Sequence, residues 1–249
     1  CHDISQRAIE QYEDMEQCRI WQQRLLQNSS AVIRCYQSMA LWHLGFPEQA
    51  IKVNEEMLVL ANNFNHPFSL AHGLHFTSWL YECCGPFDKL LEAAEEQITI
   101  SEKQGFEFWK STGVFFKGSG LFRSGKPEEA LPLLKEGMEN FRSLSAVLTL
   151  SAQLSVLADT LLVLNRFDEA ASALKEGLEL AEKNNNRAHE AELHRLMGEL
   201  ALRASNDQSA AEVHYRKALE TARNQKSRAW ELRSSVSLAM LLQEQGRIQ

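Results

Sequence analysis

The sequence lacks long apolar runs and a secretory signal, and it contains little proline or glycine. No stretch of about 18 consecutive apolar residues occurs, so the sequence predicts no membrane-spanning helix. The first ten residues, CHDISQRAIE, have neither the basic start nor the apolar centre of a signal peptide. Only 5 prolines and 12 glycines occur in 249 residues, whereas Leu, Ala, Glu, Gln and Lys are abundant. This composition favours helices.

Clusters of basic residues are missing as well. The net charge is −7 and no long run of Lys and Arg occurs, which argues against binding to nucleic-acid phosphates. We therefore expect neither nucleic acid nor a membrane among the partners. Hydrophobic residues make up 44 % of the chain and charged residues 24 %, as in an ordinary folded domain. Because the chain begins with Cys1 and not with Met, we expect it to be a piece of a longer protein.

The cysteines form no pattern typical of disulfides or of a zinc site. They are Cys1, Cys18, Cys35, Cys83 and Cys84, an odd number without paired spacing or a CxxC motif. We expect free, mostly buried thiols in a reducing cytoplasm, and no metal or other cofactor. Two alternatives have less support: a lipoprotein acylated at Cys1, and a redox role for the pair Cys83–Cys84. Adjacent cysteines rarely form a disulfide because the geometry is strained.

A period of 40 residues is the main feature of the sequence. Four similar segments repeat at this distance: LGFPEQA (44–50), CGPFDKL (84–90), SGKPEEA (124–130) and LNRFDEA (164–170). Their second residues are Gly45, Gly85, Gly125 and Asn165. Gly and Asn end helices in the left-handed conformation, and the Pro, Asp or Glu that follows suits the first turn of a new helix. Each segment therefore predicts a tight turn between two helices.

Small residues keep the same period. Ser38, Ser78, Gly118, Ala158 and Gly198 each stand twelve residues before Ala50, Leu90, Ala130, Ala170 and Ala210. Two helices approach closely where side chains are small, so these positions predict packing points. The fifth copy is shifted by one residue, because ALKEGLELA (173–181) matches HYRKALETA (214–222) at a distance of 41. On the second helices the corresponding residues are Ala61, Ser101, Phe141, Ala181 and Ala222.

A small residue followed twelve positions later by Ala is the tetratricopeptide pattern, here with a unit of 40 residues instead of about 34. The sequence predicts an all-α, right-handed α-solenoid of about five to six helix–turn–helix repeats. We expect a helical segment at 1–30 (helix near 3–27) and a repeat array at 31–249, with units near 31–66, 67–106, 107–144, 145–186 and 187–226. First helices are expected near 31–44, 67–84, 107–124, 145–164 and 187–204. Second helices are expected near 47–62, 87–104, 127–143, 167–184 and 207–224, and a final helix at 227–245.

Five stretches carry a resemblance to a known family. They are LWHLGFPEQAI (41–51), HPFSLAHGLHF (66–76), FEFWKSTGVFFKGSG (106–120), HEAELHRLMGELAL (189–202) and ELRSSVSLAMLLQEQGR (231–247). In them the chain resembles the tetratricopeptide region of bacterial signalling ATPases, in which a cyclase or DNA-binding output domain precedes a regulatory ATPase and a helical tail. The resemblance covers most of residues 12–247 and is loose at 18–30. It implies a sensing or docking module that controls a catalytic domain of the same polypeptide, and no activity of its own.

The stretch HEAELHRLMGEL (189–200) looks like a zinc-protease helix, but His189 and His194 are five residues apart. At about 100° per residue the two imidazoles diverge by roughly 140°, so they cannot chelate one metal ion from this helix. With Gly198 as position 8 of the first helix, Glu192, Arg195 and Glu199 lie on the inner, concave face. They form (i, i+3) and (i, i+4) pairs. Either these pairs satisfy one another, or Arg195 is held ready for a carboxylate of a ligand.

The same register predicts the other residues of a ligand- or peptide-binding groove on the concave face. They are Trp42, His72, His75, Trp79, Phe115, Phe122, Arg123 and Asp159. Aromatic anchors beside polar groups are typical of grooves that bind a peptide or a helix. The alternative is that the aromatic side chains fill space between long helices. A metal held by His72 and His75 with Glu82 or a cysteine is a weaker alternative, because such histidines more often stack or donate hydrogen bonds.

The sequence contains no catalytic motif with the required residue spacing and structural context. GSGLFRSGK (118–126) lacks the phosphate-loop spacing and ends a helix, and no GxSxG occurs. We therefore expect no enzyme, but a module that binds a protein or peptide segment, including its own ATPase or cyclase domains, and regulates their output. One alternative is self-assembly into a homo-oligomer through the final helix, whose Val236, Leu238, Leu241 and Leu242 have no following repeat to cover them. The other is a receptor for a signalling peptide, although the asparagines expected on its inner face lie in loops here.

Overall fold

The computed structural model describes residues 29–63, 66–147 and 149–247, and these residues form eleven α-helices and no strand. The helices are α3 (Ser29–His43), α4 (Pro47–Asn63), α5 (Pro67–Cys84), α6 (Phe87–Gln104), α7 (Glu107–Arg123), α8 (Pro127–Ser143), α9 (Leu150–Val163), α10 (Phe167–Lys183), α11 (Glu190–Ser205), α12 (Gln208–Asn224) and α13 (Arg228–Glu244). The predicted all-α class is confirmed. The helix expected near 3–27 lies outside the described residues.

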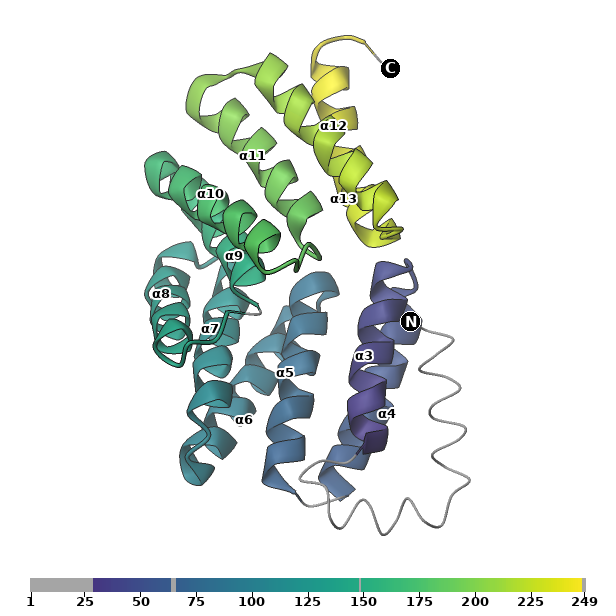
Figure 1. The fold of residues 1–249 in the computed structure, drawn as a ribbon, viewed down its shortest axis with the longest axis vertical. Helices are drawn as coiled ribbons and strands as arrows, with labels where there is room; N and C mark the ends of the chain where they lie inside the picture. Colours follow the sequence, from purple (N-terminus) through teal and green to yellow (C-terminus); the bar gives the residue numbers. More distant parts are fainter. Residues whose placement is uncertain (1–28, 64–65, 148, 248–249) are drawn as a thin grey trace. The chain divides into compact units, whose positions relative to one another are not determined.

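The chain divides after Gly125 into two compact units. Unit 1 contains α3 to α7 and unit 2 contains α8 to α13. Within each unit, helices that follow one another in the sequence pack as antiparallel neighbours, for example α5 on α6 and α11 on α12 (Figure 1). This sequential antiparallel pairing is the arrangement expected of a tetratricopeptide-like solenoid.

The helix bounds agree with the predicted ones except at two helix starts. The helices expected from 145 and 187 begin at Leu150 and Glu190. Two residues after the ends of the preceding helices α8 and α10 stands a residue of positive φ, Ser145 at 56° and Asn185 at 50°. The chain then needs several more residues to turn back, so α9 and α11 start later than predicted.

The turn residues behave as the 40-residue period predicts. Gly45, Gly85, Gly125 and Asn165 have φ values of 90°, 70°, 81° and 57°. A second series, also 40 apart, has positive φ at the other ends of the repeats: Gly105, Ser145 and Asn185. The chain therefore uses the left-handed region of φ both within each repeat and between repeats.

The small residues of the repeat are packing points, as predicted. Ser38, Ser78 and Ala158 are fully buried, and Gly118 and Gly198 are buried as well. One detail of the fifth copy was wrong, because Ala211 is fully buried and Ala210 is only half-buried. The one-residue shift therefore already applies at the start of α12, because the residue of positive φ after α11 is Asn206, which stands 41 residues after Asn165.

Gly198 lies directly against the ring of Tyr215, which gives a prediction on stability. A Cβ atom at this position would lie 2.4 Å from Cε1 of Tyr215. The ring cannot move aside easily, because it is 1 % exposed and its hydroxyl donates to Glu199 Oε1 at 2.9 Å. We expect Gly198→Ala to lower the free energy of unfolding by about 1–2 kcal/mol, since overpacking exceeds the gain in helix propensity.

The control is Gly177→Ala on α10, measured by the same urea titration. There the new Cβ would meet Leu193 Cδ2 at 2.8 Å, the end of a flexible side chain that can turn away. We expect a smaller loss for this variant. Equal stability of Gly198→Ala and the unchanged chain would contradict the packing role of Gly198.

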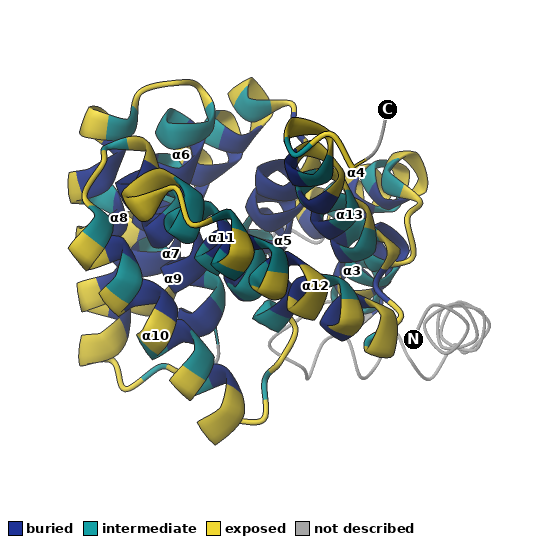
Figure 2. Cartoon of the chain, turned by 90° about the horizontal axis from the view of Figure 1, so that it is seen from above, coloured by how far each residue is buried: buried dark blue, intermediate teal, exposed yellow. Residues whose placement is uncertain are grey.

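The helices α4, α6, α8, α10 and α12 are buried along one side and exposed along the other, whereas α5, α7 and α9 are buried over most of their surface (Figure 2). In unit 1 one core cluster joins Ala31 and Cys35 of α3 to Met57 and Ala61 of α4. In unit 2 another joins Ala211 and Tyr215 of α12 to Leu238 and Leu241 of α13. No helix within the described ranges is long and apolar enough to cross a membrane.

Candidate interaction surfaces

The predicted aromatic residues of unit 1 are mostly buried. Trp42, Trp79 and Phe115 are 4 %, 9 % and 3 % exposed, and only Phe122 is half-buried. The rings of Trp42 and Trp79 pack edge to face with centroids 5.4 Å apart, which joins α3 to α5. Burial therefore favours the alternative that these aromatic side chains fill the space between helices. Their contact with a ligand stays a prediction.

His72 and His75 of α5 lie within the aromatic core of unit 1. Both rings contact Phe76 and Trp109, with centroid distances of 5.0–5.4 Å. Nδ1 of His72 is 3.8 Å from the buried Sγ of Cys35, and Nδ1 of His75 is buried without a hydrogen-bond partner in the residues described. Burial lowers the pKa of His72 to about 4 and that of His75 to about 3, so both imidazoles are neutral near pH 7.

Arg123, also predicted for the groove, is bound to a buried carboxylate. Its Nη2 and Nε atoms donate to Glu82 Oε1 at 2.7 and 3.2 Å, which joins the ends of α5 and α7. The guanidinium also lies over the ring of Phe122, with a centroid distance of 5.1 Å. Arg123 thus neutralises Glu82, whose side chain is 10 % exposed.

In unit 2 the predicted charged residues of α11 do come together. Arg195 donates from Nε and Nη2 to both carboxylate oxygens of Glu192 at 2.9 Å, and from Nη1 to Glu199 at 3.3 Å. Glu192 is 5 % exposed, whereas the side chains of Arg195 and Glu199 are 15 % and 25 % exposed. Burial disfavours the charge of Arg195, but Glu192, Asp159 and Glu199 together raise its pKa above the usual value. The residues thus form the mutually satisfied ladder of the first alternative.

Three further residues, which the sequence analysis missed, extend this ladder. Arg233 Nη1 on α13 lies 3.5 Å from Glu192, Ser237 Oγ lies 3.5 Å from Arg195 Nη1, and the hydroxyl of Tyr215 donates to Glu199. The signal for Arg233 was available, since it stands 41 residues after Glu192, the spacing of the fifth copy. Arg203 of α11 also belongs here, since its Nε lies 3.9 Å from Oε2 of Glu199. We call Asp159, Glu192, Arg195, Glu199, Arg203, Arg233 and Ser237 the polar row; it includes residues of α9, α11 and α13.

The two histidines of the stretch 189–200, His189 and His194, contact different neighbours. His189 packs against Trp230 with centroids 5.5 Å apart, and His194 stacks on His214 at 6.3 Å. Burial and the neighbouring His214 and Lys217 lower the pKa of His194 to about 4. Among the residues described, no group of three or more His, Cys, Asp or Glu is arranged to hold a metal ion.

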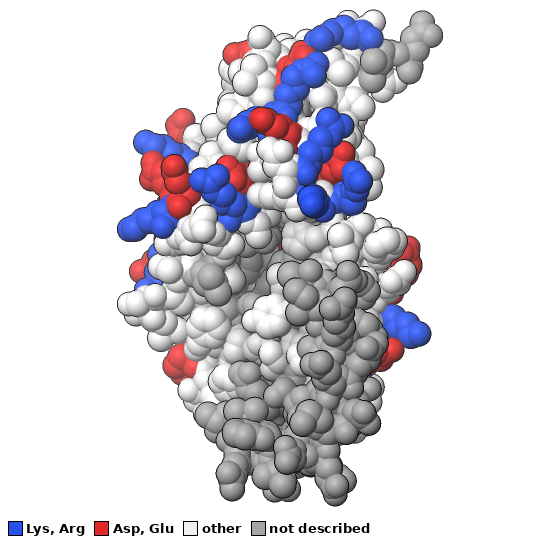
Figure 3. All heavy atoms as spheres, turned by 45° about the vertical axis from the view of Figure 1, so that its right-hand side comes forward, with Lys and Arg blue, Asp and Glu red and all other residues white. Residues whose placement is uncertain are grey.

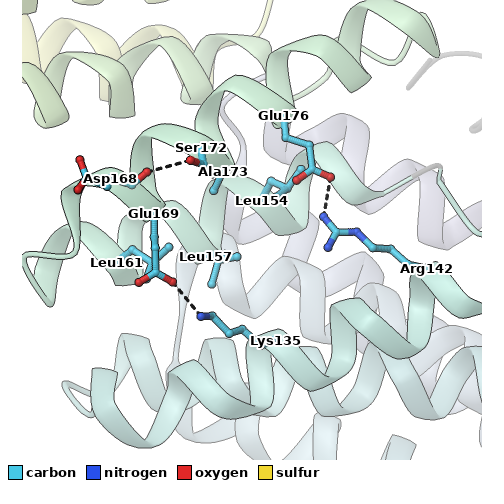
Figure 4. Close-up of a pocket in the computed structure, with 10 residues that line it drawn as sticks. All are labelled: Lys135, Arg142, Leu154, Leu157, Leu161, Asp168, Glu169, Ser172, Ala173 and Glu176. Carbon is cyan, nitrogen blue, oxygen red and sulfur yellow. Dashed lines mark hydrogen bonds and ion pairs between the residues drawn. The ribbon is translucent and has the colours of Figure 1, made fainter.

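A hollow of ≈ 330 Å³ lies between α8 and α10 over α9 (Figure 4). Its floor is apolar and consists of Leu154, Leu157 and Leu161. Basic side chains of α8 point across it to acidic side chains of α10, in the pairs Lys135–Glu169 at 3.0 Å and Arg142–Glu176 at 2.6 Å. The sequence analysis missed these pairs because their partners are 34 residues apart and lie on different helices.

The exposed face of α13 differs from the one predicted. Leu238 and Leu241 are 7 % and 2 % exposed because they pack on Ala211 and Tyr215 of α12, and Leu242 is partly buried against the same cluster. Of the four predicted residues only Val236 is exposed, at 48 %. The pairing of α13 with α12 therefore covers most of the apolar surface that the sequence analysis left open.

Comparison with known proteins supports the fold. No protein-family model matches the chain, and no curated protein matches it. Many solved structures resemble it at low identity. One is aspartyl phosphate phosphatase F from Bacillus subtilis (11 % identity, 86 % of this chain and 59 % of that chain, TM-score 0.57), and another is a Rap protein complexed with competence and sporulation factor (10 %, 98 % and 72 %, TM-score 0.58). A third is a signal transduction ATPase with numerous domains from Pyrococcus horikoshii that has a tetratricopeptide repeat sensor (12 %, 88 % and 34 %, TM-score 0.54). The chain thus spans 59 % of the phosphatase and 34 % of the ATPase. At these identities the likeness establishes the fold alone, and that fold is tetratricopeptide-like.

Proposed function

We propose that this chain is a non-catalytic module that binds a protein or peptide segment through the polar row of unit 2 and thereby regulates an attached ATPase, cyclase or transcription-factor output. The observation that carries the proposal is the row itself. Charged side chains from α11 and α13 are fixed by mutual hydrogen bonds, yet remain partly accessible. Such fixed donors and acceptors lose little conformational entropy when a ligand binds.

Within the row, the accessible ends are the natural contacts for a ligand. The side chains of Arg203, Arg233 and Glu199 are 47 %, 32 % and 25 % exposed, whereas Glu192 is buried beneath them. An extended peptide laid along α11 and α13 would meet both signs of charge. Arg195 serves in this arrangement as the residue that positions Glu192 and Glu199, since its hydrogen bonds already connect them.

The related folds are consistent with such a role. One of the similar structures is a Rap protein complexed with competence and sporulation factor, and another contains a tetratricopeptide repeat sensor within a signal transduction ATPase. A module of this fold placed beside an output domain can regulate it if the ligand binds one arrangement of the two more tightly than the other.

Site-specific photo-crosslinking tests the proposal. A photoreactive amino acid replaces Arg203, at the accessible end of the row, in the chain expressed with its natural neighbouring domains. The control places the same amino acid at Lys175, whose side chain is 79 % exposed on α10, a helix that contributes no residue to the row. We expect defined crosslinks to one protein or peptide segment from position 203 only. Equal crosslinking from both positions, or none from 203, would contradict the proposal.

A further inference from the structure

The outer side of α13 carries an apolar stripe that no other described helix covers. On the face drawn in Figure 3, charged side chains gather over the C-terminal helices and leave uncharged surface between them. Leu232, Val236 and Met240 are 66 %, 48 % and 59 % exposed and follow one another at a spacing of four residues. This spacing places them along one ridge of the helix. Three large apolar side chains in one continuous line form a surface suited to contact with another helix.

Residues of opposite charge stand at the two ends of this stripe. Four residues before Leu232 lies Arg228, whose side chain is 71 % exposed, and four residues after Met240 lies the exposed Glu244. Along the ridge the sequence therefore reads basic, apolar, apolar, apolar, acidic. Arg228 also bonds Glu231, but this pair is an (i, i+3) contact at the surface, which contributes little stability and can rearrange.

This order of residues is complementary to itself when reversed. If two copies of α13 pack antiparallel about Val236, Leu232 of each faces Met240 of the other. The same operation brings Arg228 of each copy toward Glu244 of the other, so that both ends carry opposite charges. Antiparallel contact about a two-fold axis is the symmetry of most protein dimers. Ala239 beside the stripe has a small side chain, which allows close approach of the two helices.

We propose that the stripe Leu232–Val236–Met240 is a homodimer interface, in which α13 of two copies pack antiparallel with Arg228 opposite Glu244. The occupant is a second copy of this chain, because a reversed copy supplies both the apolar ridge and the matching charges. A single pair of helices buries less area than a permanent dimer needs, so the association is weak and concentration-dependent. The proposal is independent of ligand binding at the polar row, which uses other residues.

Sedimentation equilibrium of the chain between about 1 μM and 1 mM tests this interface, a range that covers weak association. We expect the mean mass to rise from one chain, 28.3 kDa, toward two. Val236→Glu should weaken the association at least tenfold, since it buries two carboxylates in the contact. The control is Val59→Glu on α4, where an exposed valine (59 %) lies outside the stripe; it should leave the mass curve unchanged. Circular dichroism confirms that each variant is folded.

Charge reversal tests the register of the two helices. Arg228→Glu and Glu244→Arg should each weaken the association about three- to tenfold, because each places like charges opposite one another. The double variant restores opposite charges at both ends and should associate within about twofold of the unchanged chain. A mass of one chain at every concentration would overturn the proposal and leave the stripe to a different partner. The proposal would also be overturned if Val236→Glu left the strength of association unchanged. The same holds if the double variant associated no more strongly than the single variants.

Discussion

Lowering the pH from 7 to 5 should destabilise unit 1 by about 3–4 kcal/mol through His72 and His75 alone. In the folded chain burial lowers the pKa of His72 to about 4 and that of His75 to about 3. In the unfolded chain both imidazoles titrate near about 6.5. Between these values the unfolded state binds protons that the folded state does not, so stability is full above about pH 6.5 and falls as the pH is lowered toward 4.

Urea unfolding followed by tryptophan fluorescence measures this loss, because Trp109 contacts both imidazoles, and Trp42 and Trp79 lie in unit 1 as well. His75→Met should remove about half of the dependence on pH, since one of the two groups no longer titrates. It should cost little at pH 7, because Nδ1 of His75 has no hydrogen-bond partner in the described residues and Met fills a similar volume.

Phe76→Leu serves as the matched control for this effect. Phe76 contacts the same two imidazoles and is 9 % exposed, so the variant loses packing without removing a titrating group. We expect an equal loss of stability at pH 7 and pH 5 and therefore an unchanged dependence on pH. A dependence that His75→Met leaves intact would show that carboxylates, and not the buried imidazoles, cause the acid sensitivity.

The fold could be predicted from the sequence because its determinants are local. A glycine or asparagine of positive φ follows most of the described helices, and a buried small residue that recurs every 40 positions marks the contacts between helices. Both depend on backbone conformation and on the absence of side-chain atoms, which a residue type reveals directly. The late start of α9 was missed in part because Ser145 has a positive φ, which is uncommon for serine, so it gave no turn signal; the late start of α11 follows Asn185, a typical turn residue, and has no such explanation.

The site was harder to predict, because a helical register gives the direction of a side chain but not its exposure. The register assigned Trp42 and Trp79 to a ligand-binding groove, yet the two rings pack against each other and are buried. Exposure depends on how closely two helices approach, which non-local contacts determine. The ladder of α11 was predicted more fully, because Glu192, Arg195 and Glu199 interact within one helix. Its partners on α12 and α13 required the three-dimensional structure.

Replacing Arg195 by methionine should destabilise unit 2 by about 3–5 kcal/mol, because the change leaves Glu192 charged and buried without its main partner. Glu192 is 5 % exposed and receives two hydrogen bonds from Arg195. Arg233 lies 3.5 Å from the same carboxylate and can compensate in part, so the loss is expected in the lower part of this range. Urea unfolding followed by circular dichroism measures the loss, and hydrogen exchange assigns it to α11.

Two variants show whether the loss of stability in Arg195→Met comes from the buried carboxylate of Glu192, which has lost its main partner. Arg195→Met with Glu192→Leu removes both charges and should recover most of the stability, since replacing a buried ion pair by apolar residues is often nearly neutral. Lys135→Met removes an ion pair whose side chains are 46 % and 44 % exposed, and should cost at most about 1 kcal/mol. If Arg195→Met cost no more than Lys135→Met, Arg195 would not be committed to the ladder. It would then be the better candidate for direct contact with a ligand carboxylate, and Arg203 and Arg233 would lose that role.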